Sequence, residues 1–224
     1  MVSLGFWQAD KADYKADLQL KLEQRKTLRP VNLRELPSLG ESRRYLPVEL
    51  AGEYDVQHSL LLDNITLNRQ VGYHVFTPFI IDDDKTILVI RGFISQGKTR
   101  DQLPDINTPV GKINLQGLLD NTPSKTLVLA ENVQETSRWP VVLQYIDLEE
   151  IKQLLGYELY DMVLWLAPDE AGSFEYNLPV LNLNSAKNYG YAFQWFAMSL
   201  ALFIIYIVVN TKRSKKIIKV KKNE

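Results

Sequence analysis

The chain has 224 residues with 26 basic and 27 acidic side chains, so its formal net charge is −1, and it contains no cysteine. The missing thiol excludes disulfides, thiolate zinc sites and cysteine nucleophiles. Seven basic residues and one acid follow residue 210, which leaves 19 bases and 26 acids, or about −7, before it. An acidic body with a short basic tail argues against nucleic acid as a partner.

The N-terminal residues predict the end of a membrane helix, followed by an amphipathic helix and a connector. Met1–Trp7 is apolar but too short to span a bilayer, and we interpret residues 1–9 as the end of a truncated N-terminal membrane helix. Asp10–Lys26 predicts an amphipathic helix, because Tyr14, Leu18 and Leu22 recur every four residues. Pro30–Gly40 contains two prolines and a glycine and is typical of a connector.

The middle of the chain predicts short strands. Asp63-Asn64 and Asp82–Lys85 are candidate hairpin turns. Leu159–Leu166 is apolar on both faces, which favours a central or covered strand. The other expected strands are Tyr45–Ala51, Ser59–Leu62, Ile65–Asn68, Tyr73–Ile81, Thr86–Ile94, Lys112–Gln116 and Val141–Ile146.

One short helix is expected after these strands. Asp147 can cap its start, Glu150 stands at the capping-box position, and Gly156 can end it. Many strands and few helices indicate an α+β domain built on a mainly antiparallel sheet or barrel with small helices. Residues 168–187 are rich in Pro, Asn, Gly and Ser and predict a loop.

The C-terminal part predicts a transmembrane helix over residues 188–210. No charged residue lies between Asn188 and Thr211, and Tyr189, Tyr191 and Trp195 cluster at its start as interfacial aromatics do. The basic tail, 211–224, is expected on the cytoplasmic side, so residues 10–187 form an extracytoplasmic domain in contact with the lipid bilayer.

A search for catalytic or metal-binding patterns finds few candidates. His58 and His74 fall in or beside expected strands, and Asp82-Asp83-Asp84 lacks the spacing of an EF-hand, so we predict no metal site. No nucleotide-binding or hydrolase motif is present. Arg91 interrupts an apolar strand. It either faces water or makes an ion pair or anion contact, and Gly92 beside it can mark a bulge.

Five spaced segments, taken together, resemble the surfeit locus protein 1 (Surf1/Shy1) family over nearly the whole chain. The opening pattern carries Trp7, Gln8, Lys11 and Lys15, with Lys11 where the family usually has Arg. Val48–Asp55, Gly72–Phe79 and Leu88–Ser95 match three strand motifs, and Asn188–Phe196 matches the signature that enters the last helix. The motif residues of the strands include Gly72, Tyr73, Pro78, Arg91 and Gly92.

The resemblance implies a membrane-bound, non-enzymatic assembly factor with two transmembrane helices around one extracytoplasmic domain. Such proteins assist maturation of subunit I of haem-copper cytochrome c oxidase, and some are thought to handle haem a. Haem-handling members commonly carry His at the position of Asn188. Asn cannot replace imidazole as an ordinary haem ligand. This departure from the family pattern therefore argues against binding of haem a, and it affects the expected role in assembly less.

These arguments predict a docking site where both helices meet the membrane. Its candidate residues, for subunit I, an assembly intermediate or a porphyrin, are Trp7, Gln8, Lys11, Lys15, Asn188, Tyr191, Gln194 and Trp195. Aromatic anchoring alone is the other interpretation. We expect the protein in a bacterial inner membrane with a periplasmic domain, or alternatively in the mitochondrial inner membrane. The alternative function is a membrane-anchored periplasmic hydrolase whose site has no recognisable motif.

Overall fold

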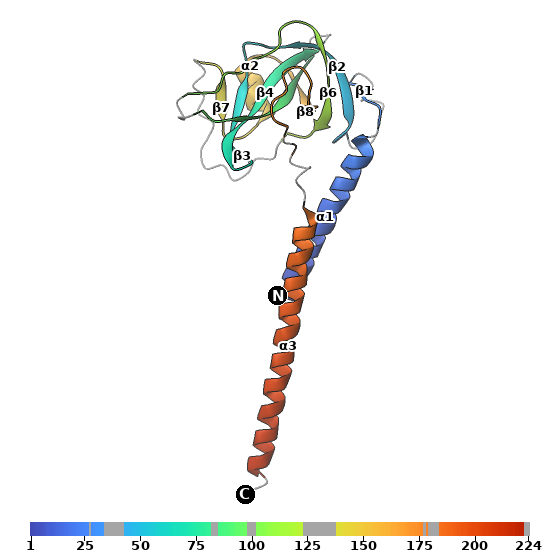
Figure 1. Ribbon diagram of the computed structural model, residues 1–224, viewed down its shortest axis with the longest axis vertical. Helices are drawn as coiled ribbons and strands as arrows, with labels where there is room; N and C mark the ends of the chain where they lie inside the picture. The colour runs from blue at the N-terminus through green and yellow to red at the C-terminus, as the bar shows by residue number, and fades with distance from the viewer. Residues whose placement is uncertain are drawn as a thin grey trace. The chain divides into compact units, whose positions relative to one another are not determined.

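The computed structural model describes residues 1–26, 28–33, 43–81, 85–97, 102–122, 138–176, 178 and 184–221. It divides into two compact units, Met1–Lys21 with Val180–Glu224, and Leu22–Pro179. The elements follow the order α1 (Val2–Lys26), β1 (Val31–Asn32), β2 (Pro47–Tyr54), β3 (Leu60–Leu67), β4 (Gln70–Ile81), β5 (Lys85–Ser95), β6 (Ile113–Asp120), β7 (Val141–Leu143), α2 (Leu148–Leu155), β8 (Leu159–Leu166) and α3 (Ser185–Lys221) (Figure 1).

The second unit is a five-stranded barrel with added strands. The sheet order β1-β2-β6-β8-β5-β4-β3-β7 closes because β2 also pairs with β4, so that β2, β6, β8, β5 and β4 form the barrel. Most pairings are antiparallel, whereas β1–β2, β3–β7 and β5–β8 are parallel. The predicted fold class, a mainly antiparallel barrel-like domain with small helices, is confirmed.

The barrel core is built by the inward side of each strand. β2 alternates strictly between buried and less buried residues, as a half-covered strand must. β8 has neighbours on both sides, β6 and β5, and its last five residues are all buried, which confirms the expected covered strand. Several expected strand limits shift: β2 begins at Pro47, β6 continues to Asp120 and β7 ends at Leu143.

The hairpin predicted at Asp63-Asn64 is wrong. β3 runs through both residues, with Asn64 at φ 60° and a register shift between Leu62 and Ile65, so the pair forms an irregularity inside the strand. The turn lies at Asn68-Arg69, where φ is 49° and 66°. Two successive positive φ values define a type I′ turn, whose twist matches that of the paired strands. The second expected turn includes residues 82–84, which lie outside the described residues.

The predicted short helix is confirmed as α2. The Asp147 carboxylate accepts hydrogen bonds from the backbone amides of Glu149 and Glu150, at 3.0 and 3.4 Å. Gly156 ends the helix at φ 77°, and its amide donates to the carbonyl of Lys152. Both ends therefore satisfy backbone groups that the helix itself leaves without partners.

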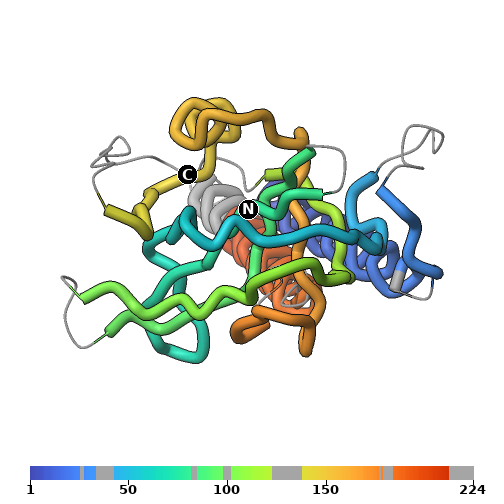
Figure 2. Tube along the Cα trace, turned by 90° about the horizontal axis from the view of Figure 1, so that it is seen from above, coloured from blue at the N-terminus to red at the C-terminus, as the bar shows by residue number. Residues whose placement is uncertain are grey.

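Two helices belong wholly or partly to the first unit. α1 is continuous from Val2 to Lys26, so the apolar start and the expected amphipathic helix form one element. Ser185–Thr211 of α3 is apolar and long enough to cross a membrane, and within the described residues it is the only segment with this property. α1 and α3 lie side by side in both views (Figures 1 and 2).

Arg91 is buried in β5, with 1 % of its surface exposed, and this excludes the first of its two expected environments, a strand face open to water. Val75 pairs with Gly92 and Phe76 with Ile90, so Arg91 is the extra residue of a β-bulge, as predicted from the adjacent glycine. Gly92 adopts φ +118°, and a Cβ there would lie 2.7 Å from the carbonyl oxygen of Glu175. Only glycine fits this position without strain.

The Arg91 guanidinium is satisfied by neutral groups. Its Nε donates to the carbonyl of Gly172 at 2.7 Å and its Nη2 to the carbonyl of Asn107 at 2.5 Å. Its Nη1 donates to the hydroxyls of Thr108, at 2.8 Å, and Thr77, at 3.3 Å. Among the described residues no carboxylate forms an ion pair with it, so the expected ion pair is not found there. Burial lowers its pKa to about 10, and it stays charged at neutral pH.

Replacing Arg91 with Met should destabilise the barrel by about 3 kcal/mol, because buried carbonyls would lose their donors. Chaotrope unfolding of the detergent-solubilised protein, followed by tryptophan fluorescence, measures the change. Arg29, which is exposed, provides the control Arg29→Met, for which no comparable loss is expected. Equal stability of both variants would contradict the structural role assigned to Arg91.

His74 should make the barrel sensitive to acid. It is buried, packs edge-on against Trp165 at 5.3 Å, and its Nε2 has no hydrogen-bond partner among the described residues. Burial lowers its pKa from 6.5 to about 4. The unfolded chain therefore binds a proton first as pH falls, and stability should drop by about 3 kcal/mol between pH 6.5 and pH 4. His74→Leu should flatten this part of the stability–pH curve; an unchanged slope would contradict the assignment.

Candidate functional site

The first unit contains an antiparallel pair of helices. The rings of Phe6 on α1 and Phe196 on α3 meet edge-on at 5.2 Å between centroids. Further along, the hydroxyl of Tyr189 donates to Asp13 Oδ1 at 2.6 Å. Because the residue number rises along α1 while it falls along α3, the two helices run in opposite directions.

Small residues allow the helices to approach closely. Gly5, Gln8, Ala12 and Lys15 follow one another at spacings of three and four residues, which places them on one face of α1. Ala12 is fully buried, and a Cβ on Gly5 would come within 2.7 Å of the Phe196 ring. This face of α1 therefore forms the seam against α3.

Asn188 stands at the centre of the seam and is bonded at both ends of its amide. Its Nδ2 donates to Gln8 Oε1 at 2.7 Å, and its Oδ1 accepts from Lys15 Nζ at 2.8 Å. Its side chain lies in the interface, with 8 % of the residue exposed. Three predicted site residues, far apart in sequence, thus form one hydrogen-bonded network that holds the helices together.

The seam has two flanks, and the remaining predicted residues of the helices all lie on the second. The contacts between α1 and α3 define the first flank by Phe6, Asp13, Tyr189 and Phe196. By helical spacing, Trp7 and Lys11 lie on the other flank of α1, and Tyr191, Gln194 and Trp195 lie on the matching flank of α3. We call these last five residues the aromatic face.

The register of the pair aligns the members of the aromatic face. Equal rise per residue in both helices puts Trp7 at the level of Trp195 and Lys11 at the level of Tyr191. Trp7 and Tyr191 are 54 % and 53 % exposed, and Trp195 is partly buried. The Lys11 ammonium lies over the Trp7 ring, 5.0 Å from its centroid. The face is therefore a solvent-accessible aromatic surface with a cation at one edge.

The strand motif residues belong to the barrel unit, where packing explains them. A Cβ on Gly72 would lie 2.2 Å from the carbonyl oxygen of Ile94, and Tyr73 is 3 % exposed. The carbonyl of Pro78 accepts from the amide of Asp55 at 2.9 Å. Gly92 completes the bulge at Arg91. These residues shape the barrel, and their part in a functional site stays a prediction.

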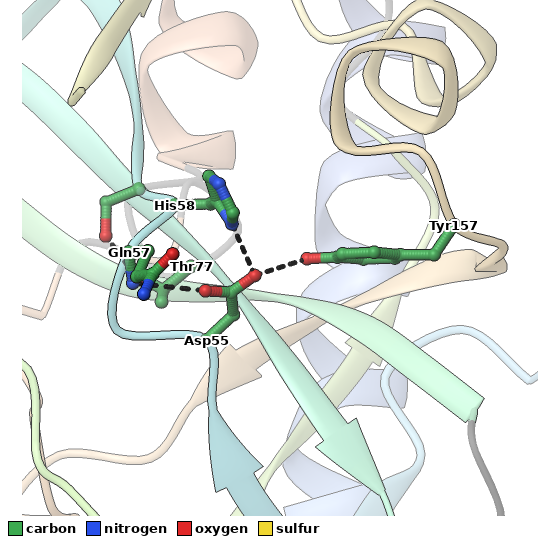
Figure 3. A network of polar contacts seen from close by, with 6 residues as sticks. Asp55, Gln57, His58, Thr77 and Tyr157 are labelled. Atoms are coloured by element: carbon green, nitrogen blue, oxygen red, sulfur yellow. Dashed lines mark hydrogen bonds and ion pairs between the residues drawn. The ribbon is translucent and has the colours of Figure 1, made fainter. Parts of the chain in front are cut away.

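A second polar cluster surrounds Asp55 in the barrel unit (Figure 3). The Asp55 Oδ2 lies 2.6 Å from His58 Nδ1 and accepts from the Tyr157 hydroxyl at 2.9 Å. Its Oδ1 accepts from the amide of Gln57 at 3.1 Å. The His58 ring packs edge-on against Trp139 at 4.5 Å. The sequence shows only the three-residue spacing of Asp55 and His58, and nothing in it points to Tyr157.

The cluster keeps Asp55 ionised and Tyr157 protonated. Burial would raise the pKa of Asp55, but the hydrogen bonds from His58, Tyr157 and Gln57 outweigh it and lower the pKa. Burial and the bond to Asp55 raise the pKa of the Tyr157 phenol, which therefore stays protonated. The carboxylate orients the imidazole, as in many base dyads.

The dyad lacks a nucleophile in the described part of the chain, where no hydroxyl contacts His58 Nε2. The neighbouring Ser59 hydroxyl is 3.0 Å from that of Thr77 instead. No cluster of three or more His, Cys, Asp or Glu that could hold a metal occurs within the described ranges. The geometry thus offers an oriented base but no complete hydrolytic constellation.

Comparison with known proteins gives consistent matches. The family model described as the SURF1 family matches residues 1–200. Surfeit locus protein 1 of Mus musculus is 28 % identical over 68 % of the chain, and that of Homo sapiens 29 % over 69 %. The matches cover 54 % and 56 % of these two relatives, so the chain spans about half their length. A SURF1-like protein of Rickettsia conorii is 23 % identical over 93 % of the chain and 85 % of that relative.

Proposed function

Since the chain belongs to the SURF1 family, we propose that it is a membrane-anchored assembly factor for haem-copper cytochrome c oxidase that assists maturation of subunit I. The observation that carries the proposal is the family match over residues 1–200, which includes the helix pair and its aromatic face. The function is binding rather than catalysis. The Asp55–His58 dyad would favour a hydrolase only with a nucleophile beside it.

The aromatic face is the proposed docking surface for subunit I and its assembly intermediates. Exposed aromatic side chains contribute large contact areas at little cost in conformational entropy. Gln194 is exposed on the same flank, and an amide at the membrane boundary gains most when a partner satisfies it. The hydrogen bonds of Asn188 hold the two helices in the register that places Trp7 and Trp195 at the same level.

The orientation follows from the charges beyond the apolar helix. Seven basic residues follow Thr211, which supports a cytoplasmic tail and an extracytoplasmic barrel. We assign the protein to a bacterial inner membrane, with the mitochondrial inner membrane as the alternative. In this orientation α3 contacts oxidase intermediates within the membrane, and the barrel contacts their extracytoplasmic side.

Haem a fits position 188 poorly. Both ends of the Asn188 amide are engaged, by Gln8 and Lys15, and the side chain is buried in the helix seam. An amide is also no ordinary axial ligand for haem iron. Assembly in this protein therefore proceeds without iron ligation at residue 188, and any haem affinity comes from apolar contact with the aromatic face.

Removing the aromatic face should impair oxidase assembly. The double variant Trp7→Ala/Trp195→Ala should reduce the subunit I that copurifies with the tagged protein by about tenfold or more, as loss of interface anchors does. Mature oxidase in cells lacking the native gene should fall in parallel. Phe193→Ala is the matched control, because Phe193 is 74 % exposed on the other flank of α3. Equal loss in the control, or no loss in the double variant, would contradict the docking surface.

Haem titration tests the role of residue 188. The purified wild-type protein should bind haem a weakly and without the absorption and magnetic circular dichroism bands of imidazole ligation. Asn188→His should add no axial ligation, because the new imidazole would stand in the helix seam between Gln8 and Lys15. Tight imidazole-ligated haem in the wild type, lost in His58→Ala, would place the haem site in the barrel unit. A gain of imidazole-ligated haem in Asn188→His would contradict the burial of this position in the seam.

A further inference from the structure

The helix pair carries its charges unequally on its two flanks. Lys187 precedes Tyr191 by one turn, so it lies on the same flank of α3 as the aromatic face. Lys11 and Lys15 lie on the corresponding side of α1, at the levels of Tyr191 and of Asn188. We call Lys11, Lys15 and Lys187 the basic flank. It unites three cations from two helices that are distant in sequence.

Two acidic residues of α1 near this level are engaged away from the basic flank. Asp13 accepts from Tyr189 at 2.6 Å on the opposite flank. Asp17 pairs with Lys21 at 2.7 Å. In the part of the chain that the structure describes, no carboxylate makes an ion pair with Lys11 or Lys187. Asp10, three residues after Trp7, borders the same flank, so the basic flank carries three cations against one carboxylate and keeps a net positive charge.

The position of the basic flank along α3 identifies the anion that it meets. The apolar segment that could cross a membrane begins at Ser185, and Tyr191 and Trp195 follow at the level expected of interfacial aromatics. Lysines at this level extend their ammonium groups toward lipid headgroups while their methylene chains remain over apolar side chains. In Lys11 the ammonium itself lies over the Trp7 ring, 5.0 Å from its centroid, so a cation and an aromatic side chain share this surface.

We propose that the basic flank binds the phosphate of an anionic phospholipid whose acyl chains lie along Trp7, Trp195 and Met198. Met198 continues this flank one turn beyond Trp195 and is 43 % exposed. A zwitterionic lipid offers the same phosphate with a compensating ammonium, so the net positive charge of the flank favours the anionic headgroup. This inference goes beyond the assembly function and does not depend on it: the lipid shares Trp7 and Trp195 with the surface proposed for subunit I and occupies them while no oxidase intermediate is docked.

Quenching of tryptophan fluorescence by brominated lipid tests the proposal on the full chain in mixed bilayers. Brominated phosphatidylglycerol should quench more strongly than brominated phosphatidylcholine at equal mole fraction. Lys11→Gln/Lys187→Gln should reduce the preference for phosphatidylglycerol about tenfold or more, since each lysine near an anionic surface contributes about fivefold. Lys21→Gln removes one charge from the same helix, at a residue already paired with Asp17, and should leave the preference unchanged.

Three results would overturn the proposal. Equal quenching by the two lipids in the wild type would mean that the flank does not select charge. An equal effect of Lys21→Gln would mean that the lipid preference comes from the overall positive charge of the helix and not from the basic flank. A preference that survives Lys11→Gln/Lys187→Gln, together with loss of copurifying subunit I, would show that the lysines meet an acidic protein segment instead. Because lipid quenching does not require oxidase, failure of the assembly proposal would be seen separately.

Discussion

The charge buried at Arg91 is the constraint on which the barrel unit depends. Burying a guanidinium is strongly unfavourable unless its donors are satisfied, and here carbonyls and hydroxyls perform this role. To reach them, β5 must bulge and Gly92 must adopt a positive φ, so that the loop at Asn107 and the turn at Gly172 are fixed against the strand. The rings of Tyr54 and Phe174 lie 5.2 and 4.8 Å from the guanidinium carbon and complete the enclosure.

The helix pair follows the same rule on a smaller scale. A buried amide is tolerated at Asn188 because Gln8 and Lys15 engage both of its ends, and the resulting network fixes the register of α1 against α3. The register decides which side chains share a flank. The proposed docking surface and the basic flank are thus consequences of this network in the seam, although none of their members touches Asn188 except Lys15.

The two histidines show how the surroundings of a side chain determine its chemistry. His58 shares a short contact with Asp55 and remains partly exposed, so it is an oriented base. His74 is enclosed beside Trp165 with its Nε2 unpartnered in the described chain, and burial keeps it neutral. Neither distinction is visible in the sequence, where both residues stand in or beside apolar strands.

The sequence by itself determined the elements and their class. Apolar length defined the C-terminal helix, the Asp147 and Gly156 caps defined α2, and alternation of side chains defined most strands, because these signals are local. Only the tertiary structure decided that Asn68-Arg69 rather than Asp63-Asn64 makes the turn, that Arg91 is buried among carbonyls, and that Tyr157 joins Asp55. Those outcomes depend on strand register and on groups up to 102 residues apart, which no local pattern encodes. The assignment of Gln8, Lys15 and Asn188 to one network likewise required the packing of two helices at opposite ends of the chain.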